Sequence, residues 1–75
     1  MKFVAMRLEH PSYVSIIEGI GGWNAAFFAW CEDMNGYDII QTGLNNTLGN
    51  GTKESAIGEA KSWAEDEGVE YKGVK

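Results

Sequence analysis

The chain has 75 residues and a formal net charge of −5, which limits it to one small, acidic domain. It has one cysteine and one histidine, so neither a disulfide nor a zinc site is expected to stabilise a core that is marginal at this length. The longest apolar run falls short of the ~20 residues of a membrane span, and the acidity opposes direct binding to nucleic acid or anionic membranes. We therefore expect a cytoplasmic protein without metal or cofactor, stabilised by tight packing or by a homodimer.

The first predicted elements lie before a pair of glycines, Gly21 and Gly22. Residues 2–9 alternate well enough for a strand, which the sequence His10-Pro11-Ser12 ends. Residues 13–20 are rich in β-branched side chains and favour a strand, although their apolar positions also fit helical spacing. The glycine pair then predicts a turn.

The most apolar segment, residues 23–31, predicts the central strand of a sheet. Asn35-Gly36 is a hairpin signal, so residues 37–42 should be the returning strand. Residues 43–51 are rich in Gly and Asn and predict a loop.

The last predicted element is a helix over residues 53–67. Thr52 is placed as its N-cap and Gly68 as its left-handed C-cap, and apolar residues recur with helical spacing at positions 57, 60 and 64, flanked by 56 and 63. Residues 69–72 either add an edge strand or trail off. Strands first and a helix last predict an α+β fold: one domain over residues 1–75, with an antiparallel sheet of three to four strands packed against one C-terminal helix.

Catalytic chemistry finds little support in the residues. Cys31 and His10 are the only thiol and imidazole, but Cys31 lies in an apolar run and His10 precedes a proline at a turn. Glu32 and Asp33 are paired carboxylates beside a hairpin turn, where such acids are usually solvated. We therefore predict a protein that binds rather than catalyses.

The central strand is apolar on both sides, which one helix cannot cover. Trp23 and Phe27 alternate onto one face, whereas Phe28 and Trp30 alternate onto the other. The second face should be covered by the N-terminal segment, by a second copy or by a partner protein. Trp23, Phe28 and Trp30 are therefore candidate partner-binding residues.

Acidic residues form a second set of candidates. Glu65, Asp66 and Glu67 lie at the helix C-terminus, where the helix dipole disfavours negative charge. Glu32 and Asp33 come next, in a stretch between Arg7 and Lys53 that contains no Lys or Arg. These acids either face the basic surface of a partner or only keep the chain soluble.

In size, acidity, content of a few strands with one helix, and lack of catalytic residues, the whole chain resembles the small phage-encoded inhibitors of anti-CRISPR type. That resemblance implies an inhibitor that blocks a host nucleoprotein or nucleic-acid-binding protein in the host cytoplasm. Residues 23–64 also resemble HicB-like antitoxin domains, in strand order and in the stretches Thr42-Gly43 and Thr52-Lys53-Glu54-Ser55-Ala56 near the helix entry. The alternative to an inhibitor is a structural, assembly or antitoxin homodimer joined through the aromatic sheet face.

Overall fold

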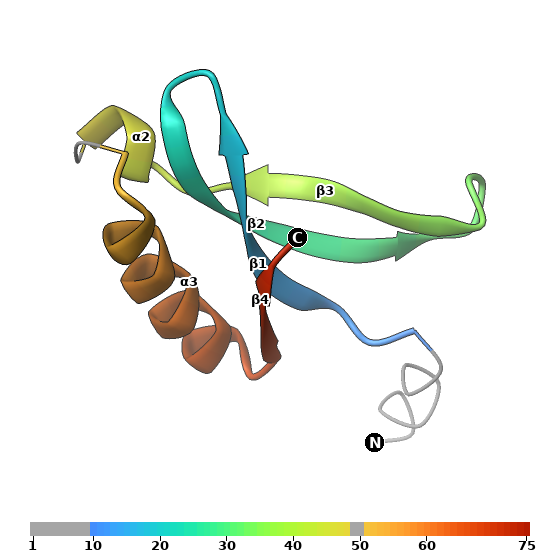
Figure 1. The fold of residues 1–75 in the computed structure, drawn as a ribbon. Helices are drawn as coiled ribbons and strands as arrows, with labels where there is room; N and C mark the ends of the chain where they lie inside the picture. The colour runs from blue at the N-terminus through green and yellow to red at the C-terminus, as the bar shows by residue number, and fades with distance from the viewer. Residues whose placement is uncertain (1–9, 49–50) are drawn as a thin grey trace.

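A computed structural model describes residues 10–48 and 51–75, so the strand predicted at residues 2–9 lies outside the described residues (Figure 1). The elements in chain order are β1 (Tyr13–Gly19), β2 (Gly22–Cys31), β3 (Gly36–Thr42), α2 (Asn45–Leu48), α3 (Lys53–Glu67) and β4 (Glu70–Val74). The strands form one sheet in the order β3-β2-β1-β4. The predicted α+β fold, with four strands packed against one long C-terminal helix, is confirmed.

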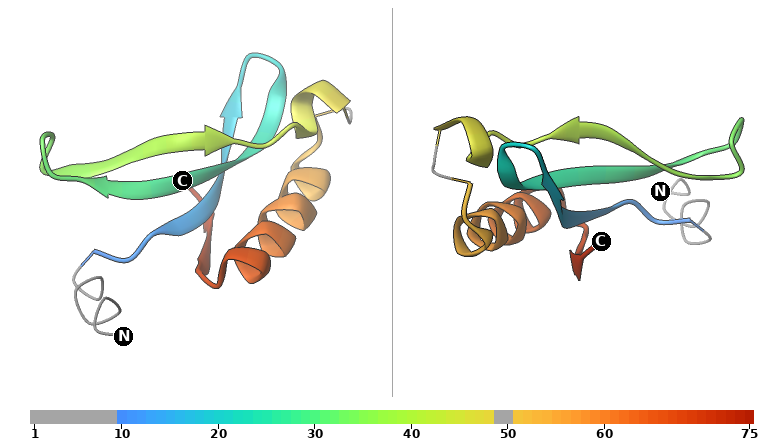
Figure 2. Two further views of the ribbon diagram at one scale, coloured as in Figure 1. Left: turned by 180° about the vertical axis from the view of Figure 1, so that it is seen from behind. Right: turned by 45° about the horizontal axis from the view of Figure 1, so that its top comes forward.

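One part of the predicted sheet needs correction. β1 with β2 and β2 with β3 are antiparallel, but β4 pairs parallel to β1, so the sheet is mixed. β3 runs in the same direction as β1, and α3 carries the chain from β3 to β4. A helical crossover of this kind returns the next strand parallel to the one before it, so β4 runs parallel to β1. Figure 2 shows α3 against one face of the sheet, with the β2–β3 hairpin extending beyond it.

The ends of α3 follow from local side-chain chemistry. The Thr52 hydroxyl accepts a hydrogen bond of 3.2 Å from the Ser55 amide, which satisfies one of the free donors at the helix start. Gly68 has φ 72° and its amide donates to the carbonyls of Ala64 and Glu65. Both predicted caps and both predicted ends of the helix are confirmed.

Small residues let α3 lie close to the sheet. Ala56, Ala60 and Ala64 are buried against Val14 and Ile16 of β1, with Ala25 of β2 in the same cluster. The centre of the apolar stripe is therefore this alanine row. Ile57 and Trp63 pack at its margins and are half-buried.

The predicted loop over residues 43–51 contains the short helix α2, which the sequence analysis did not predict. Two buried asparagines hold it. Asn24 of β2 donates from Nδ2 to the Gly43 carbonyl (2.8 Å) and accepts at Oδ1 from the Asn45 amide (3.0 Å). Asn45 in turn donates from Nδ2 to the carbonyls of Trp23 (2.9 Å) and Thr52 (3.1 Å). These bonds fix the connection between β3 and α3 to β2.

The sheet face opposite α3 is largely covered by side chains of the same chain. Tyr13 is 3% exposed and Phe28 5% exposed, and their rings stack with centroids 5.0 Å apart. Lys72 and Lys75 extend over the Tyr13 ring, and the Lys75 ammonium donates to the Tyr13 hydroxyl at 2.9 Å. Lysine stems cover apolar surface while their charges stay near water. This arrangement provides much of the second covering that the apolar central strand requires.

No helix among residues 10–48 and 51–75 is long and apolar enough to cross a membrane.

Candidate functional site: an acidic groove beside the edge strand

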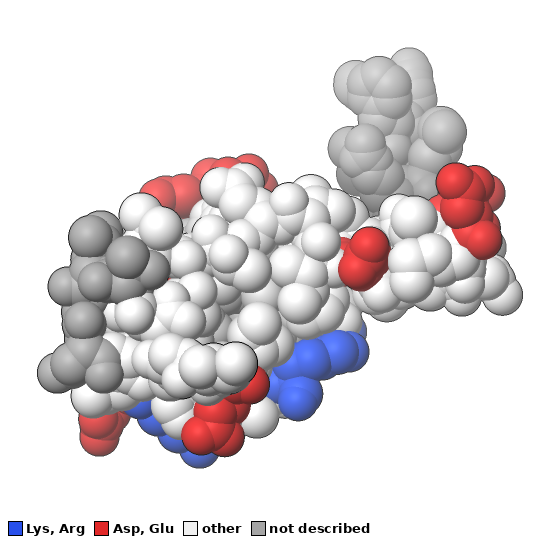
Figure 3. Space-filling view, turned by 90° about the horizontal axis from the view of Figure 1, so that it is seen from above, with Lys and Arg blue, Asp and Glu red and all other residues white. Residues whose placement is uncertain are grey.

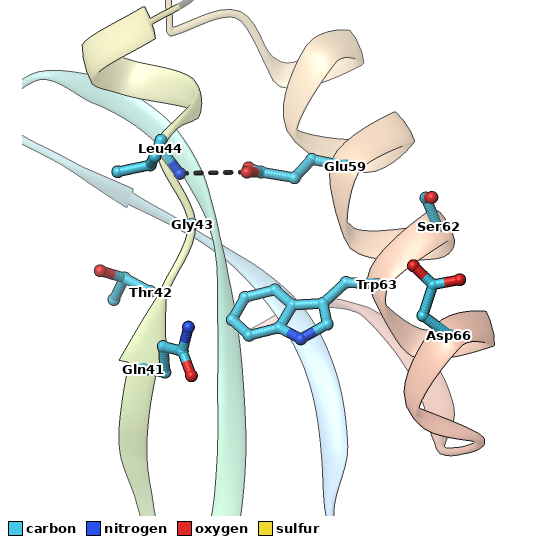
Figure 4. Close-up of a pocket in the computed structure, with 8 residues that line it drawn as sticks. All are labelled: Gln41, Thr42, Gly43, Leu44, Glu59, Ser62, Trp63 and Asp66. Atoms are coloured by element: carbon cyan, nitrogen blue, oxygen red, sulfur yellow. Dashed lines mark hydrogen bonds between the residues drawn. The ribbon is translucent and has the colours of Figure 1, made fainter.

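An open groove of about 380 Å³ lies between the end of β3 and one side of α3 (Figure 4). The strand and the connection after it form one wall, and α3 forms the other. The lining residues are Gln41, Thr42, Gly43, Leu44, Glu59, Ser62, Trp63 and Asp66. The backbones of α3 and β3 stay apart, with no pair of Cα atoms within 8 Å, whereas α3 comes that close to β1, β2 and β4.

Helical spacing places the groove residues of α3 on one side. Glu59, Trp63 and Asp66 are separated by four and three residues, which puts all three on neighbouring turns of the same face. Trp63 is half-buried and contacts Phe27, with ring centroids 5.7 Å apart. Its indole extends from α3 toward the strands and forms part of the groove surface (Figure 4).

Glu59 joins α3 to the opposite wall. Its Oε2 accepts a hydrogen bond of 3.0 Å from the Leu44 amide. A Cβ at Gly43 would lie 2.5 Å from the Glu59 carboxylate, so only glycine lets the carboxylate rest against the backbone there. Oε1 of Glu59 is buried and has no hydrogen-bond partner among the described residues. A buried acceptor without a donor is costly, so the contact of Glu59 with the opposite wall carries an energetic cost.

The charge of the groove is negative. Its lining contains the carboxylates of Glu59 and Asp66 and no Lys or Arg. The two lysines of α3 lie over aromatic rings outside the groove. The Lys53 ammonium is 5.2 Å from the ring centre of Trp23, and that of Lys61 is 5.9 Å from the ring centre of Tyr71. An aromatic surface in the same groove as two carboxylates attracts a cation both by charge and by the face of the indole ring.

The acidic residues predicted from the sequence do not form one surface. Glu65, Asp66 and Glu67 are all exposed in the last turn of α3, but only Asp66 lines the groove. Glu32 and Asp33 lie in the turn between β2 and β3, at the far end of the molecule from α3 (Figure 1). In Figure 3, acidic side chains occur at several separate places on the face shown and do not form one patch.

The three predicted aromatic residues lie on opposite sides of the sheet. Trp23 packs in the cluster under α3, whereas Phe28 and Trp30 lie on the other face. Phe28 is nearly buried, and Trp30 is half-buried beneath His10, whose ring stacks on it at 3.6 Å. None of them lines the groove.

Of the charged and aromatic residues of the groove, only Asp66 was predicted as a site residue. Trp63 was expected to flank the apolar stripe, and Glu59 was not predicted to have a role. The signal was present, because an acid, a Trp and an acid at positions 59, 63 and 66 share a helix face beside the alanine row.

The described part of the chain contains no group of three or more His, Cys, Asp and Glu side chains placed to hold a metal ion. Cys31, a free and half-buried thiol, ends β2, and the His10 ring stacks on Trp30.

Comparison of the chain with protein-family models, curated proteins and solved structures finds no match. The fold and the groove define a small α+β domain with an open acidic groove between a helix and an edge strand.

Proposed function

We propose that this chain is a non-catalytic binding domain that holds a basic segment of another protein in the groove and thereby inhibits or modulates that protein. One observation carries the proposal: the Trp63 indole and the carboxylates of Glu59 and Asp66 line the same open groove. A guanidinium or ammonium group entering there would stack on the indole and meet both acids.

The shape of the groove favours a chain segment over a small molecule. Small-molecule sites enclose most of the ligand surface, whereas this groove is open along one side and bounded by only two elements. An extended segment needs no enclosure, because it runs along the groove and places one side chain after another into it. Nucleic acid is disfavoured by the two carboxylates and by the net charge of −5.

The nature of the partner follows from charge. Nucleic-acid-binding proteins carry the Arg- and Lys-rich surfaces that suit an acidic groove. A phage-encoded inhibitor of a host defence nucleoprotein is the form of this function that the resemblance to anti-CRISPR proteins supports. A homodimer through the aromatic face finds less support, because Tyr13 and Phe28 on that face are already almost buried.

Neutralising the groove acids is expected to weaken partner binding by about tenfold or more, which corresponds to ~1.4 kcal/mol. The variant Glu59→Gln/Asp66→Asn removes both charges while preserving side-chain shape. Gln also keeps an oxygen for the Leu44 amide. The matched control is Glu65→Gln/Glu67→Gln, which removes two charges from the same helix outside the groove lining.

The measurement is a quantitative pull-down from bacterial lysate with the parent and both variants, followed by titration of the captured protein at two salt concentrations. A partner lost with the groove variant and kept with the control supports the proposal. Equal loss with both variants would show only a general attraction to acidic surfaces, and equal retention would remove the groove as the site.

A further inference from the structure

β3 forms an edge of the sheet beside the groove. Among the described residues it pairs only with β2, so its outer row of backbone groups has no strand partner there. The strand is exposed, with Ile39 37% and Ile40 63% exposed, and it contains neither Lys nor Pro, although it carries one charged residue, Asp38. An edge strand without a strand partner is a template for another strand.

The register shows which backbone groups face outward. The Ile39 amide donates to its neighbour Asp38 at Oδ1 (2.9 Å), so it points away from β2. In an antiparallel ladder, alternate residues face the partner strand, which places the Tyr37 backbone groups outward as well. Ile40 is the extra residue of a bulge, since Phe28 pairs with Ile39 and Phe27 with Gln41.

We propose that the basic partner segment binds as an additional β-strand on the free edge of β3, with alternate basic side chains directed into the groove. This inference rests on the proposed function and specifies how the partner is held. Gln41 and Thr42 belong to both the edge strand and the groove lining, so one extended segment reaches the strand edge and the acids of α3 together. Backbone pairing would supply affinity, and the groove would select for positive charge at every second residue.

Charge decides between a basic partner and a second copy of this chain. Pairing two β3 strands brings Asp38 of each copy to the shared edge, within two chains that each carry −5. Like charges across a strand pair are destabilising, whereas a basic strand is attracted by Asp38 as well as by Glu59 and Asp66. Asp38, which accepts from the Ile39 amide in the free protein, therefore also favours a basic strand at this edge.

The test uses three synthetic peptides and the intact chain. The parent peptide is acetyl-Arg-Val-Arg-Val-Arg-Val-amide, in which every arginine falls on one face of an extended strand. A second peptide is N-methylated at the arginines and a third at the valines, so each loses the backbone N–H donors along one edge. Both methylated peptides share the conformational effect of methylation, and each serves as the control for the other. Affinities are measured by titration, and amide hydrogen exchange of Ile39 is followed by NMR.

Strand addition uses only one edge of the peptide, so we expect one methylated copy, but not both, to lose at least tenfold in affinity. We also expect the parent peptide to slow exchange of the Ile39 amide. Equal binding by all three peptides, without protection of Ile39, would overturn strand addition and leave the acidic groove as the proposed site. A different result would be that the parent peptide binds the Glu59→Gln/Asp66→Asn variant as tightly as it binds the unmodified protein. That result would contradict the proposed function. A free protein that sediments as a dimer with a protected Ile39 amide would overturn the proposal in favour of a second copy.

Discussion

Replacing Asn24 with alanine is expected to lower the free energy of unfolding by about 3 kcal/mol and to weaken binding in the groove. Asn24 is 8% exposed, donates to the Gly43 carbonyl and accepts from the amides of Ala25 and Asn45. Alanine removes all three bonds and leaves their partners unpaired near the core, and each unpaired buried group costs about 1–3 kcal/mol. Gly43 would then be held to β2 only by its amide on the Ala25 carbonyl, which loosens one groove wall.

The measurement is urea denaturation followed by tryptophan fluorescence, with peptide titration under conditions where the variant remains folded. Asn24→Asp keeps both accepted hydrogen bonds but buries a charge and places a carboxylate oxygen against the Gly43 carbonyl, so its stability is also expected to fall below that of the parent. If Asn24→Ala binds basic peptide as the parent does, the groove wall does not depend on this network.

Features set by neighbouring residues were predictable from the sequence. Thr52 and Gly68 mark the two ends of α3 because each satisfies free backbone groups within one turn of the helix. The β2–β3 hairpin is similar, since Asn35 adopts φ 55° in a turn closed by its amide on the Glu32 carbonyl. The strand at residues 13–19 was favoured by β-branched content, and its pairing with β2 and β4 excludes the helical alternative.

Features set by distant residues were not predictable. α2 has four residues and depends on Asn24, which lies 21 residues before Asn45 in the chain. The parallel pairing of β4 depends on where α3 delivers the chain, and no local signal in residues 70–74 encodes it. Both features depend on contacts between residues far apart in the chain, which local sequence patterns do not predict.

The candidate site shows the same division. A consecutive run of acids drew attention to Glu65, Asp66 and Glu67, but consecutive residues on a helix point in different directions. Spacing by four and three residues selects Glu59, Trp63 and Asp66 instead, and only the fold shows that β3 faces them across a groove. Charge composition therefore predicts only the sign of the proposed partner, and the helix period identifies the residues that would meet it.

Gly22→Ala is expected to cost at least about 3 kcal/mol of stability, whereas Gly58→Ala is expected to add up to about 1 kcal/mol. Gly22 has φ 111°, and a Cβ there would lie 2.6 Å from the Gly51 carbonyl oxygen, which is backbone and cannot rotate aside. A Cβ at Gly58 of α3 meets nothing within 4 Å. The same chemical change should therefore have opposite signs at the two positions.

Thermal unfolding separates these outcomes, because ~1 kcal/mol shifts the midpoint of a domain this small by about 4–8 °C. Gly22 is the first residue of β2 and lies beside Gly51. The Trp23 amide donates to the Gly51 carbonyl at 2.8 Å, so the start of β2 is bonded directly to the segment that leads into α3. If Gly22→Ala melts with the parent, that backbone contact does not exist. The groove would then depend more on the hydrogen bonds of Asn24 and Asn45, and Asn24→Ala should weaken peptide binding more strongly.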